Sequence, residues 1–452
     1  MATQVSIVSR EAVRPSLPTP DHLRTHKLSF LDQLHPTIFS HVALYYLADN
    51  SNDGKLNISE SLNHLKESLS KTLTRFYPLA GRIAEDQLSI DCNDEGLHYF
   101  EARVNCFLAN FLTKPDLNLL NQFYPCHPSN IEPCARIYPV MIQINIFDCS
   151  SIVIGLCLSH KILDGISTST FLKGWAACAR GCIEATRPVF RAASLFPPSN
   201  NLPMDAIALL GRSMVKTGNC ITRRFLFDSS SMAALKSRAS GRSGIQNPSR
   251  VEAVSAFIWK SAMSALEANA GHQKPSIISH AVDLRRRMEL PLEEHMGNLL
   301  WIPYAQWLPE EDKELKYLIR KIRETITSID GDFVGKLQSG EGSSIVSENV
   351  KAMTELCSKG PVEYYGFTSW SKFGMYETEF GWGKPTWVSS HRITGPVFMN
   401  LVHMVETKRG DGIEAWITLD ERDMAALLGD QEFLKFASVD PALFPRGTAE
   451  AK

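Results

Sequence analysis

The sequence contains no long apolar run and no excess of charge of either sign. Its 452 residues carry 47 Lys and Arg against 49 Asp and Glu, so neither nucleic acid nor an anionic membrane is an expected partner. No stretch approaches the ~18 apolar residues that a membrane span requires, and residues 1–20 lack the apolar core of a secretory signal. We therefore expect a cytoplasmic protein.

The ten cysteines lack the spacing of a metal site or of a disulfide framework. There is no C-x-x-C pair and no histidine at zinc-finger spacing, so we expect no structural metal and cysteines that act as small buried apolar residues. The sequence also shows no motif for a covalent nucleophile. There is no G-x-S-x-G elbow, and Cys157 lies inside an apolar run, where a thiol is ordinarily inert.

The length of the chain favours two domains, because single cores stop growing near ~250 to 300 residues. With 44% hydrophobic and 21% charged residues, the composition is that of a globular protein. A stretch with three prolines and no clean period precedes residue 222. We predict an N-terminal domain over residues 1–195, a connection over 196–222 and a C-terminal domain over 223–452.

The pattern of apolar residues predicts a mixed α/β fold. Leucines at spacings of three and four predict a helix over 56–75, with Ser59 as its cap, followed by a pair of short strands. The β-rich runs 140–147 and 152–158 predict a hairpin, and 166–180 has helical periodicity. In the second half we expect strands over 221–228 and 276–282 and helices over 229–240 and 251–268.

The turn between the strand ending near residue 158 and the next helix holds His160, four residues before Asp164. A histidine is neutral at physiological pH and can accept a proton from an alcohol, since its unperturbed pKa is near ~6.5. The alternative is a purely structural role, in which His160 is a hydrogen-bonded histidine at the end of a core strand. The spacing alone does not choose between the two interpretations.

A second motif, EFGWGKP at 379–385, makes the first informative. Phe-Gly-Trp-Gly is expected by chance only on the order of once in a thousand such sequences. Together, HKILDG at 160–165 and EFGWG at 379–383 resemble the paired signatures of the plant BAHD acyltransferases. Further segments extend the resemblance along the chain, closest to the branch that acetylates alkaloids and alcohols: LSFLDQ at 28–33, FYPLAGR at 76–82, VDLRRRM at 282–288, MGN at 296–298, FTSW at 367–370 and GIEAW at 412–416.

The resemblance implies a monomer of two similar chloramphenicol-acetyltransferase-like domains, each a mixed sheet with flanking helices, and a channel between them. Acyl-CoA would enter from one side as a co-substrate and the alcohol from the other, with no permanently bound cofactor. His160 would be the general base, without a covalent enzyme intermediate. Asp164 would pair with Arg285 and hold the turn; the competing interpretation is an Asp164 that touches the imidazole, as in a hydrolase triad.

The same resemblance suggests further site residues. Ser249 and Arg250 match positions that meet the nucleotide phosphates, and a guanidinium suits a phosphate well. Thr368 and Trp370 match positions near the pantetheine arm. Residues expected to support the site are Gly165, Gly381, Trp382 and Gly383; residues expected around the acceptor are Ile38, Ser40 and His41.

Two positions depart from the family pattern. Glu379 stands where Asp is usual, and Ser150 and Ser151 stand where glycines are common. The site around Glu379 must accommodate an extra methylene group. Ser150 and Ser151 lack the freedom of glycine to adopt positive φ.

The expected function is acetyl transfer from acetyl-CoA to a hydroxyl of a plant specialised metabolite, with an alkaloid favoured as acceptor. A terpenoid or phenolic acceptor, or another acyl donor such as malonyl-CoA, is the alternative, and a family member that binds without turnover is a second one. Condensation domains share the His-x-x-x-Asp turn but usually show a doubled histidine, whereas Ser159 precedes His160 here.

Overall fold

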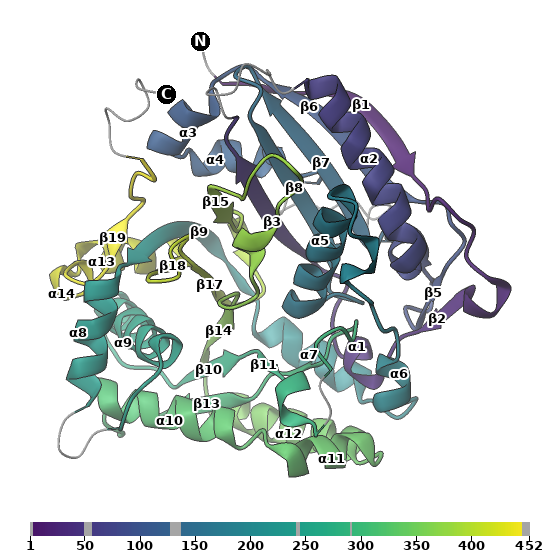
Figure 1. Cartoon of the computed structure of the whole chain (residues 1–452). Coiled ribbons are helices and arrows are strands. Elements are labelled where there is room, and N and C mark those ends of the chain that lie inside the picture. The colour runs from purple at the N-terminus through teal and green to yellow at the C-terminus, as the bar shows by residue number, and fades with distance from the viewer. Residues whose placement is uncertain (1–2, 49–56, 127–136, 241–244, 290–291, 445–452) are drawn as a thin grey trace.

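Two large mixed β-sheets, each covered by helices, make up most of the molecule (Figure 1). The computed structural model describes residues 3–48, 57–126, 137–240, 245–289 and 292–444. Within these ranges, no helix has both the length and the apolarity to cross a membrane.

The first sheet comes mainly from the N-terminal part of the chain. Every residue of its central hairpin, β7 (Val140–Phe147) and β8 (Ile152–Ser159), is buried, as expected for strands covered on both faces. Helices α2 (Ile58–Arg75) and α5 (Gly165–Ala179) pack side by side over one face (Figure 1). In sheet order the strands are β1 (Val5–Val13), β6 (Leu97–Val104), β7 (Val140–Phe147), β8 (Ile152–Ser159), β3 (Phe39–Tyr46) and β15 (Trp387–Ser389); only β6 and β7 run parallel.

The second sheet belongs to the C-terminal half. Its strands are β13 (Tyr304–Trp307), β10 (Ser276–His280), β14 (Glu363–Ser369), β17 (Asn400–Glu406), β18 (Ile413–Asp420), β9 (Lys216–Phe227) and β16 (Thr394–Val397), with β19 (Ser438–Val439) also on β9. β14 runs parallel to both β10 and β17. The helices of this half that accompany the sheet are α8 (Ser229–Ala239), α9 (Arg250–Ala270), α10 (Leu315–Thr327), α13 (Glu421–Gly429) and α14 (Gln431–Leu434).

The two halves interlock at β15, which lies far along the chain but pairs with β3 of the first sheet. Its Trp387 is 1% exposed. The indole packs against Tyr45 on β3, with ring centroids 4.7 Å apart, and against Trp416 on β18, at 6.1 Å. One side chain therefore contacts both sheets.

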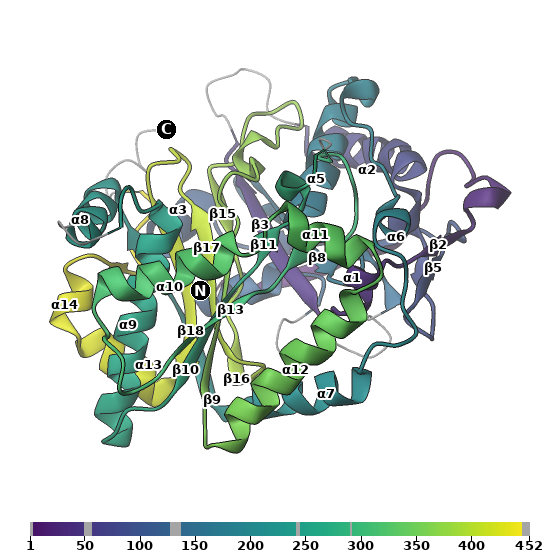
Figure 2. The same cartoon turned by 90° about the horizontal axis from the view of Figure 1, so that it is seen from below.

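A third apolar cluster joins the halves at another place. It combines Phe30 and Leu31 of α1 (Phe30–Gln33) with Leu284, Leu299 and Trp301 from the second half. Helix α12 (Gly342–Ser358) packs against α7 (Met204–Ser213) nearby (Figure 2). The remaining elements are β2 (Thr25–Lys27), β4 (Arg82–Ile83), β5 (Ser89–Asp91), α3 (Leu108–Thr113), α4 (Leu117–Leu120), α6 (Ala192–Leu195), β11 (Val282–Asp283), β12 (Leu300–Trp301) and α11 (Gly331–Gln338).

Most of the expected elements are present, with three corrections. Helix α2 is capped by Asn57, whose side chain accepts from the backbone N–H of Glu60, and not by Ser59. The strand expected over 276–282 breaks between β10 and β11. The stretch 196–222, for which a connection between domains and no helix was predicted, contains α7 and the first residues of β9.

Helix α7 was missed because the three prolines that precede it indicated a connection. Its Ile207 and Leu210, with Met214 at its end, do lie at helical spacing and pack against two apolar clusters. No residue of α7 is fully buried, however, and Leu209 is 66% exposed. The domain boundaries themselves stay predictions.

Candidate active site

His160 lies where β8 ends and the chain turns into α5. Its backbone N–H donates to the carbonyl of Ile38 at 2.9 Å, which extends the β3–β8 pairing by one residue. Leu163 N–H then donates back to Ser159 O at 3.1 Å, and Asp164 caps α5 through the N–H of Ser167 at 2.8 Å. The strand-to-helix turn is thus the one that the sequence predicts, and the His160 side chain is partly buried on it.

Asp164 points away from the imidazole and into a buried ion pair. Its Oδ2 accepts from Arg285 Nη1 at 2.6 Å and its Oδ1 from Nη2 at 3.2 Å. Leu299 N–H also donates to Oδ2, at 3.1 Å. Asp164 and Arg285 are each 3% exposed. In the part of the chain that the structure describes, these partners occupy the carboxylate, and it makes no hydrogen bond to His160.

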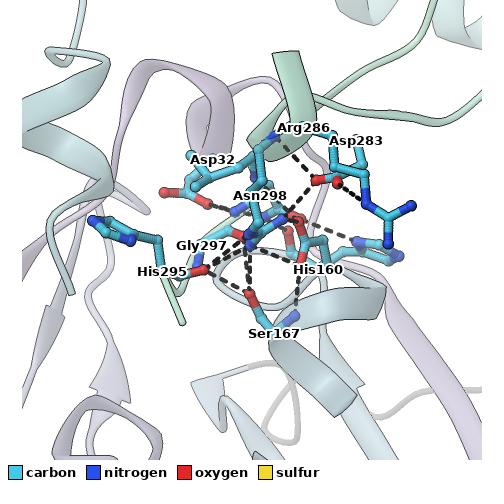
Figure 3. Close-up of polar contacts among 11 residues, drawn as sticks. Asp32, His160, Ser167, Asp283, Arg286, His295, Gly297 and Asn298 are labelled. Carbon is cyan, nitrogen blue, oxygen red and sulfur yellow. Dashed lines mark hydrogen bonds and ion pairs between the residues drawn. The ribbon is translucent and has the colours of Figure 1, made fainter. Parts of the chain in front are cut away.

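Arg285 also binds the segment that follows it. Its guanidinium donates to the carbonyls of His295 and Gly297, at 2.8 and 3.1 Å, and to Ser167 Oγ at 3.1 Å. Ser167 Oγ in turn accepts from Gly297 N–H at 3.1 Å. Figure 3 shows Ser167, His295 and Gly297 close to Asn298 and His160. The segment 295–299 is therefore tied to the first turn of α5.

The residue that contacts the His160 imidazole is Asn298 and not Asp164. Its Nδ2 donates to Asp32 Oδ1 at 2.9 Å and to His160 O at 2.7 Å, and both partners can only accept. Its Oδ1 must therefore face His160 Nδ1, 3.4 Å away. Because an amide oxygen only accepts, the proton of the neutral ring is on Nδ1 and the lone pair is on Nε2.

The surroundings of His160 keep it neutral. The pKa of His160 is lowered to about 4, mainly by burial and then by the neighbouring His35 ring, although Asn298 and Asp164 raise it. The His35 ring is stacked on His160, with centroids 5.6 Å apart and planes at 14°. Burial also lowers the pKa of His35. A neutral His160 can act as a proton acceptor over the whole physiological range.

The second sheet contributes residues close to the same ring. Burial, followed by repulsion from His160, lowers the pKa of His403 to about 4, which places this β17 residue within electrostatic reach of the base. Thr368 is paired in register with His403, and Trp370 stacks on it with ring centroids 5.9 Å apart. The structure thus brings Thr368 and Trp370 to the His160 neighbourhood through His403.

Ser249 and Arg250 lie together at the start of α9. Ser249 is exposed and forms a capping box with Glu252. The Arg250 guanidinium donates to the carbonyl of Gly410. The pair therefore stands at the positive end of a 21-residue helix.

The EFGWG segment packs on the first sheet and on α5, which fits an architectural role. Gly381 and Gly383 have φ of 110° and 105°, a region that favours glycine. Trp382 packs edge-on to Tyr46 of β3, with centroids 6.4 Å apart. The longer side chain of Glu379 is accommodated, because its Oε1 accepts from the N–H groups of both glycines, at 2.5 and 3.2 Å.

The second departure from the family pattern carries a local cost. Ser150 adopts a φ of 63°, the left-handed region that costs a non-glycine residue about 1–2 kcal/mol. The neighbouring Ser151 offsets part of this cost, since its Oγ accepts from Ala48 N–H at 3.0 Å.

The remaining expected residues have mixed surroundings. Gly165 allows a close approach, because a Cβ there would lie 2.1 Å from the Phe373 ring. Ile38 is 49% exposed and Ser40 is partly buried, so both are open to an acceptor. His41 is only 1% exposed and packs between other rings. Burial raises the pKa of the Cys157 thiol, as expected for an inert cysteine.

Sequence reasoning did not assign roles to Asn298, Asp32, His35 or His403. Asn298 was part of a matched segment, and Asp32 had only been used to locate a loop. Their interactions with His160, or with Asn298 in the case of Asp32, join residues far apart in the chain, and no local spacing signals them.

Comparisons with known proteins show what this chain is similar to over nearly its whole length. A family model described as the Transferase family matches residues 3–434. The chain is 40% identical to an epi-neemfruitin B 7-O-acetyltransferase of Melia azedarach, covering 96% of this chain and 99% of that protein. It is 36% identical to stemmadenine O-acetyltransferase of Catharanthus roseus, covering 97% and 99%. The crystal structure of vinorine synthase superimposes with a TM-score of 0.80 at 35% identity, covering 96% and 99%.

Substitution of Asp164 by Asn tests whether the ion pair supports the structure. The change keeps the shape but leaves the buried Arg285 charge without its counter-ion, so we expect a loss of about 3–5 kcal/mol in the free energy of unfolding. Urea denaturation followed by circular dichroism measures it. Asp283→Asn is the matched control, because Asp283 contacts the same guanidinium at 3.2 Å but is 24% exposed, and we expect a smaller loss. A fully stable Asp164→Asn protein would instead favour the triad interpretation.

Proposed function

The chain belongs to the Transferase family of BAHD acyltransferases, and from that premise we propose that His160 is the general base of acetyl transfer from acetyl-CoA to an alcohol. It is an acyl-CoA-dependent O-acyltransferase with the two-domain mixed α/β fold of vinorine synthase. The observation that supports the role of His160 best is its fixed tautomer, with Nδ1 directed at Asn298 and the Nε2 lone pair available.

The reaction needs one proton acceptor and no covalent enzyme stage. Nε2 of His160 removes the proton of the acceptor hydroxyl as the oxygen attacks the thioester carbonyl. The tetrahedral intermediate then expels the thiolate of coenzyme A, which takes the proton back from the imidazolium. The products are an ester and coenzyme A, and the imidazole is restored. Asn298 supports the charged ring through its amide oxygen.

Coenzyme A is proposed to reach His160 from the side of the second sheet, along a channel between the two domains. Ser249 and Arg250 suit the phosphates, because helix α9 presents its positive end and Arg250 supplies a cation. Thr368 and Trp370, next to His403, suit the pantetheine arm. No permanently bound cofactor enters this scheme, and the monomeric state and cytoplasmic location stay predictions.

The acceptor is proposed to be a hydroxyl of a plant specialised metabolite that enters from the side of Ile38 and Ser40. An alkaloid is the acceptor class expected from the sequence. A terpenoid alcohol is the second candidate, since relatives of this chain are named for limonoid acceptors.

Incubation with acetyl-CoA and two sets of alcohols, alkaloids and limonoids, tests the function. We expect release of free thiol together with a product that is heavier by one acetyl group. His160→Ala should lower the rate by about 10²- to 10⁴-fold, the usual contribution of a general base, whereas His22→Ala, at an exposed position, should leave it unchanged. Absence of thiol release with every alcohol would indicate a binding protein, and consumption of only malonyl or aromatic thioesters would refute the acetyl assignment.

The pH dependence of kcat/KM tests the electrostatics of the base. Because burial holds the pKa of His160 at about 4, its neutral form persists well below the ordinary value of ~6.5. We expect kcat/KM to stay level as the pH falls to about 5 and to decline only nearer 4. An acid limb centred on ~6.5 would contradict the burial of the ring.

A stability measurement must accompany the pH profile. His160, His280 and His403 all have a folded-state pKa of about 4, below the unfolded value, so the unfolded state binds more protons in acid. The free energy of unfolding should therefore fall as the pH drops from ~6.5 towards 4. Circular dichroism at each pH separates this loss from titration of the base.

Asn298→Ala tests the positioning role of the amide. Loss of one hydrogen bond to the developing imidazolium, worth about 1–3 kcal/mol, should lower kcat by roughly 10- to 100-fold with little change in KM. Since the Asn298 contact raises the pKa of His160, the acid limb should also move to lower pH, which a purely structural role would not cause. Asn269→Ala, which breaks a contact with Asp423 instead, should change neither quantity.

A further inference from the structure

A second cluster of chemically reactive side chains lies on the same β3–β8 pair of strands, near the end that leads to His160. His41, Cys126 and Cys157 each direct a nitrogen or sulfur atom to one place, and these atoms all lie within 4.8 Å of one another. Among the residues that the structure describes, it is the one group of three His, Cys, Asp or Glu residues with such a geometry. The transfer reaction uses none of the three.

The fold builds this cluster from two strands and a loop. His41 on β3 is paired directly with Cys157 on β8, so their side chains leave the sheet on the same face. Cys126 approaches from the segment after the short helix Asn121–Phe123. Its Sγ lies 3.1 Å from Cys157 Sγ and 3.9 Å from His41 Nε2.

The imidazole of His41 is poorly satisfied by the protein. It is 1% exposed, and its Nδ1 has no hydrogen-bond partner among the described residues. Its ring packs against Tyr124 and His391, with centroids 5.2 and 4.6 Å away. The protein therefore holds this ring mainly through contacts with its faces, and Nε2, which lies 3.9 Å from Cys126 Sγ, is the nitrogen available as a ligand.

We propose that His41, Cys126 and Cys157 form a binding site for one Zn²⁺ ion. Two thiolates and one imidazole are ligands that zinc prefers, and three protein ligands leave a fourth position for water. Around a tetrahedral zinc ion, ligand distances of ~2.0–2.3 Å place two sulfurs about 3.8 Å apart and a sulfur and a nitrogen about 3.5 Å apart. The observed 3.1 and 3.9 Å each require less than ~1 Å of adjustment.

The charge balance suits a buried position. Both thiols lose their protons to solvent on binding, and two thiolates neutralise the two positive charges of zinc. A neutral complex avoids the cost of placing a net charge beside Cys157, which is 0% exposed. Cys126 is partly exposed and offers the path by which the ion enters.

A disulfide between the two cysteines is the competing use of the same atoms. It would have to close the sulfur pair from 3.1 Å to about 2.05 Å and would require an oxidant that accepts two electrons. It would also leave His41 without a role. The presence of the imidazole next to both sulfurs favours the metal.

Titration of the reduced, metal-free, full-length protein with Co²⁺ tests the site. We expect one equivalent to bind with thiolate-to-metal charge-transfer absorption and the strong visible bands of a tetrahedral ion, and Zn²⁺ to abolish both. Zinc should also raise the melting temperature, because it binds the folded state. Neither signal depends on acyl transfer, so the test of the metal site is independent of the test of the enzyme activity.

Four single variants complete the experiment. Cys126→Ser and His41→Phe should lose the charge-transfer signal and the rise in melting temperature; Cys126 is partly exposed, so its variant should fold even if the other does not. Cys92→Ser, at a buried position outside the cluster, and Cys182→Ser, at an exposed one, should behave as the wild type. An unchanged signal in Cys126→Ser, no binding by the wild type, or loss of two titratable thiols without metal uptake would overturn the proposal.

Discussion

The bidentate ion pair between Arg285 and Asp164 is the interaction on which the proposed catalytic centre depends. Both side chains are buried, so either charge alone would be costly, and together they satisfy one another. The pair joins the N-terminal turn of α5 to a segment of the second half. The pair also fixes the position of Asn298, because it holds both of its chain neighbours: Arg285 binds Gly297, and Asp164 binds Leu299. The orientation of the His160 ring is thus set by a charge pair that does not touch it.

This arrangement differs physically from a hydrolase triad. In a triad a carboxylate contacts the imidazole and stabilises its charged form, whereas here an amide oxygen takes that place and the carboxylate is neutralised by Arg285. With no carboxylate contact to oppose it, burial holds the pKa of the proposed base at about 4, below that of free histidine. A weaker base draws the hydroxyl proton less strongly, but its conjugate acid returns the proton readily to a departing thiolate. The lower basicity of His160 has the consequence that its ring is neutral when substrate binds at physiological pH.

The sequence predicted those parts of the site that sit inside recognisable motifs. His160, Asp164 and Arg285 were named, and the ion pair between the last two is present. Asn298, Asp32 and His403 were not assigned roles, because they meet His160 or its neighbours only through the packing of separate segments. The periodic elements of the two sheets were predicted, whereas α7, which follows three prolines and has no fully buried residue, was not. The sequence left open whether the extra methylene of Glu379 would fit. It does, because the carboxylate accepts hydrogen bonds from the N–H groups of Gly381 and Gly383.

The position of the base where two halves meet follows from the three apolar cores. The first core holds β8 and so the start of the His160 turn. The third core holds α1, which carries Asp32, together with Leu284 and Leu299, which flank Arg285 and Asn298. The second core holds the strand that carries His403. None of the three contains every contact that the imidazole makes. A competent base therefore forms only when all three cores are packed, so a change that loosens any of them should impair proton transfer even where it lies far from His160.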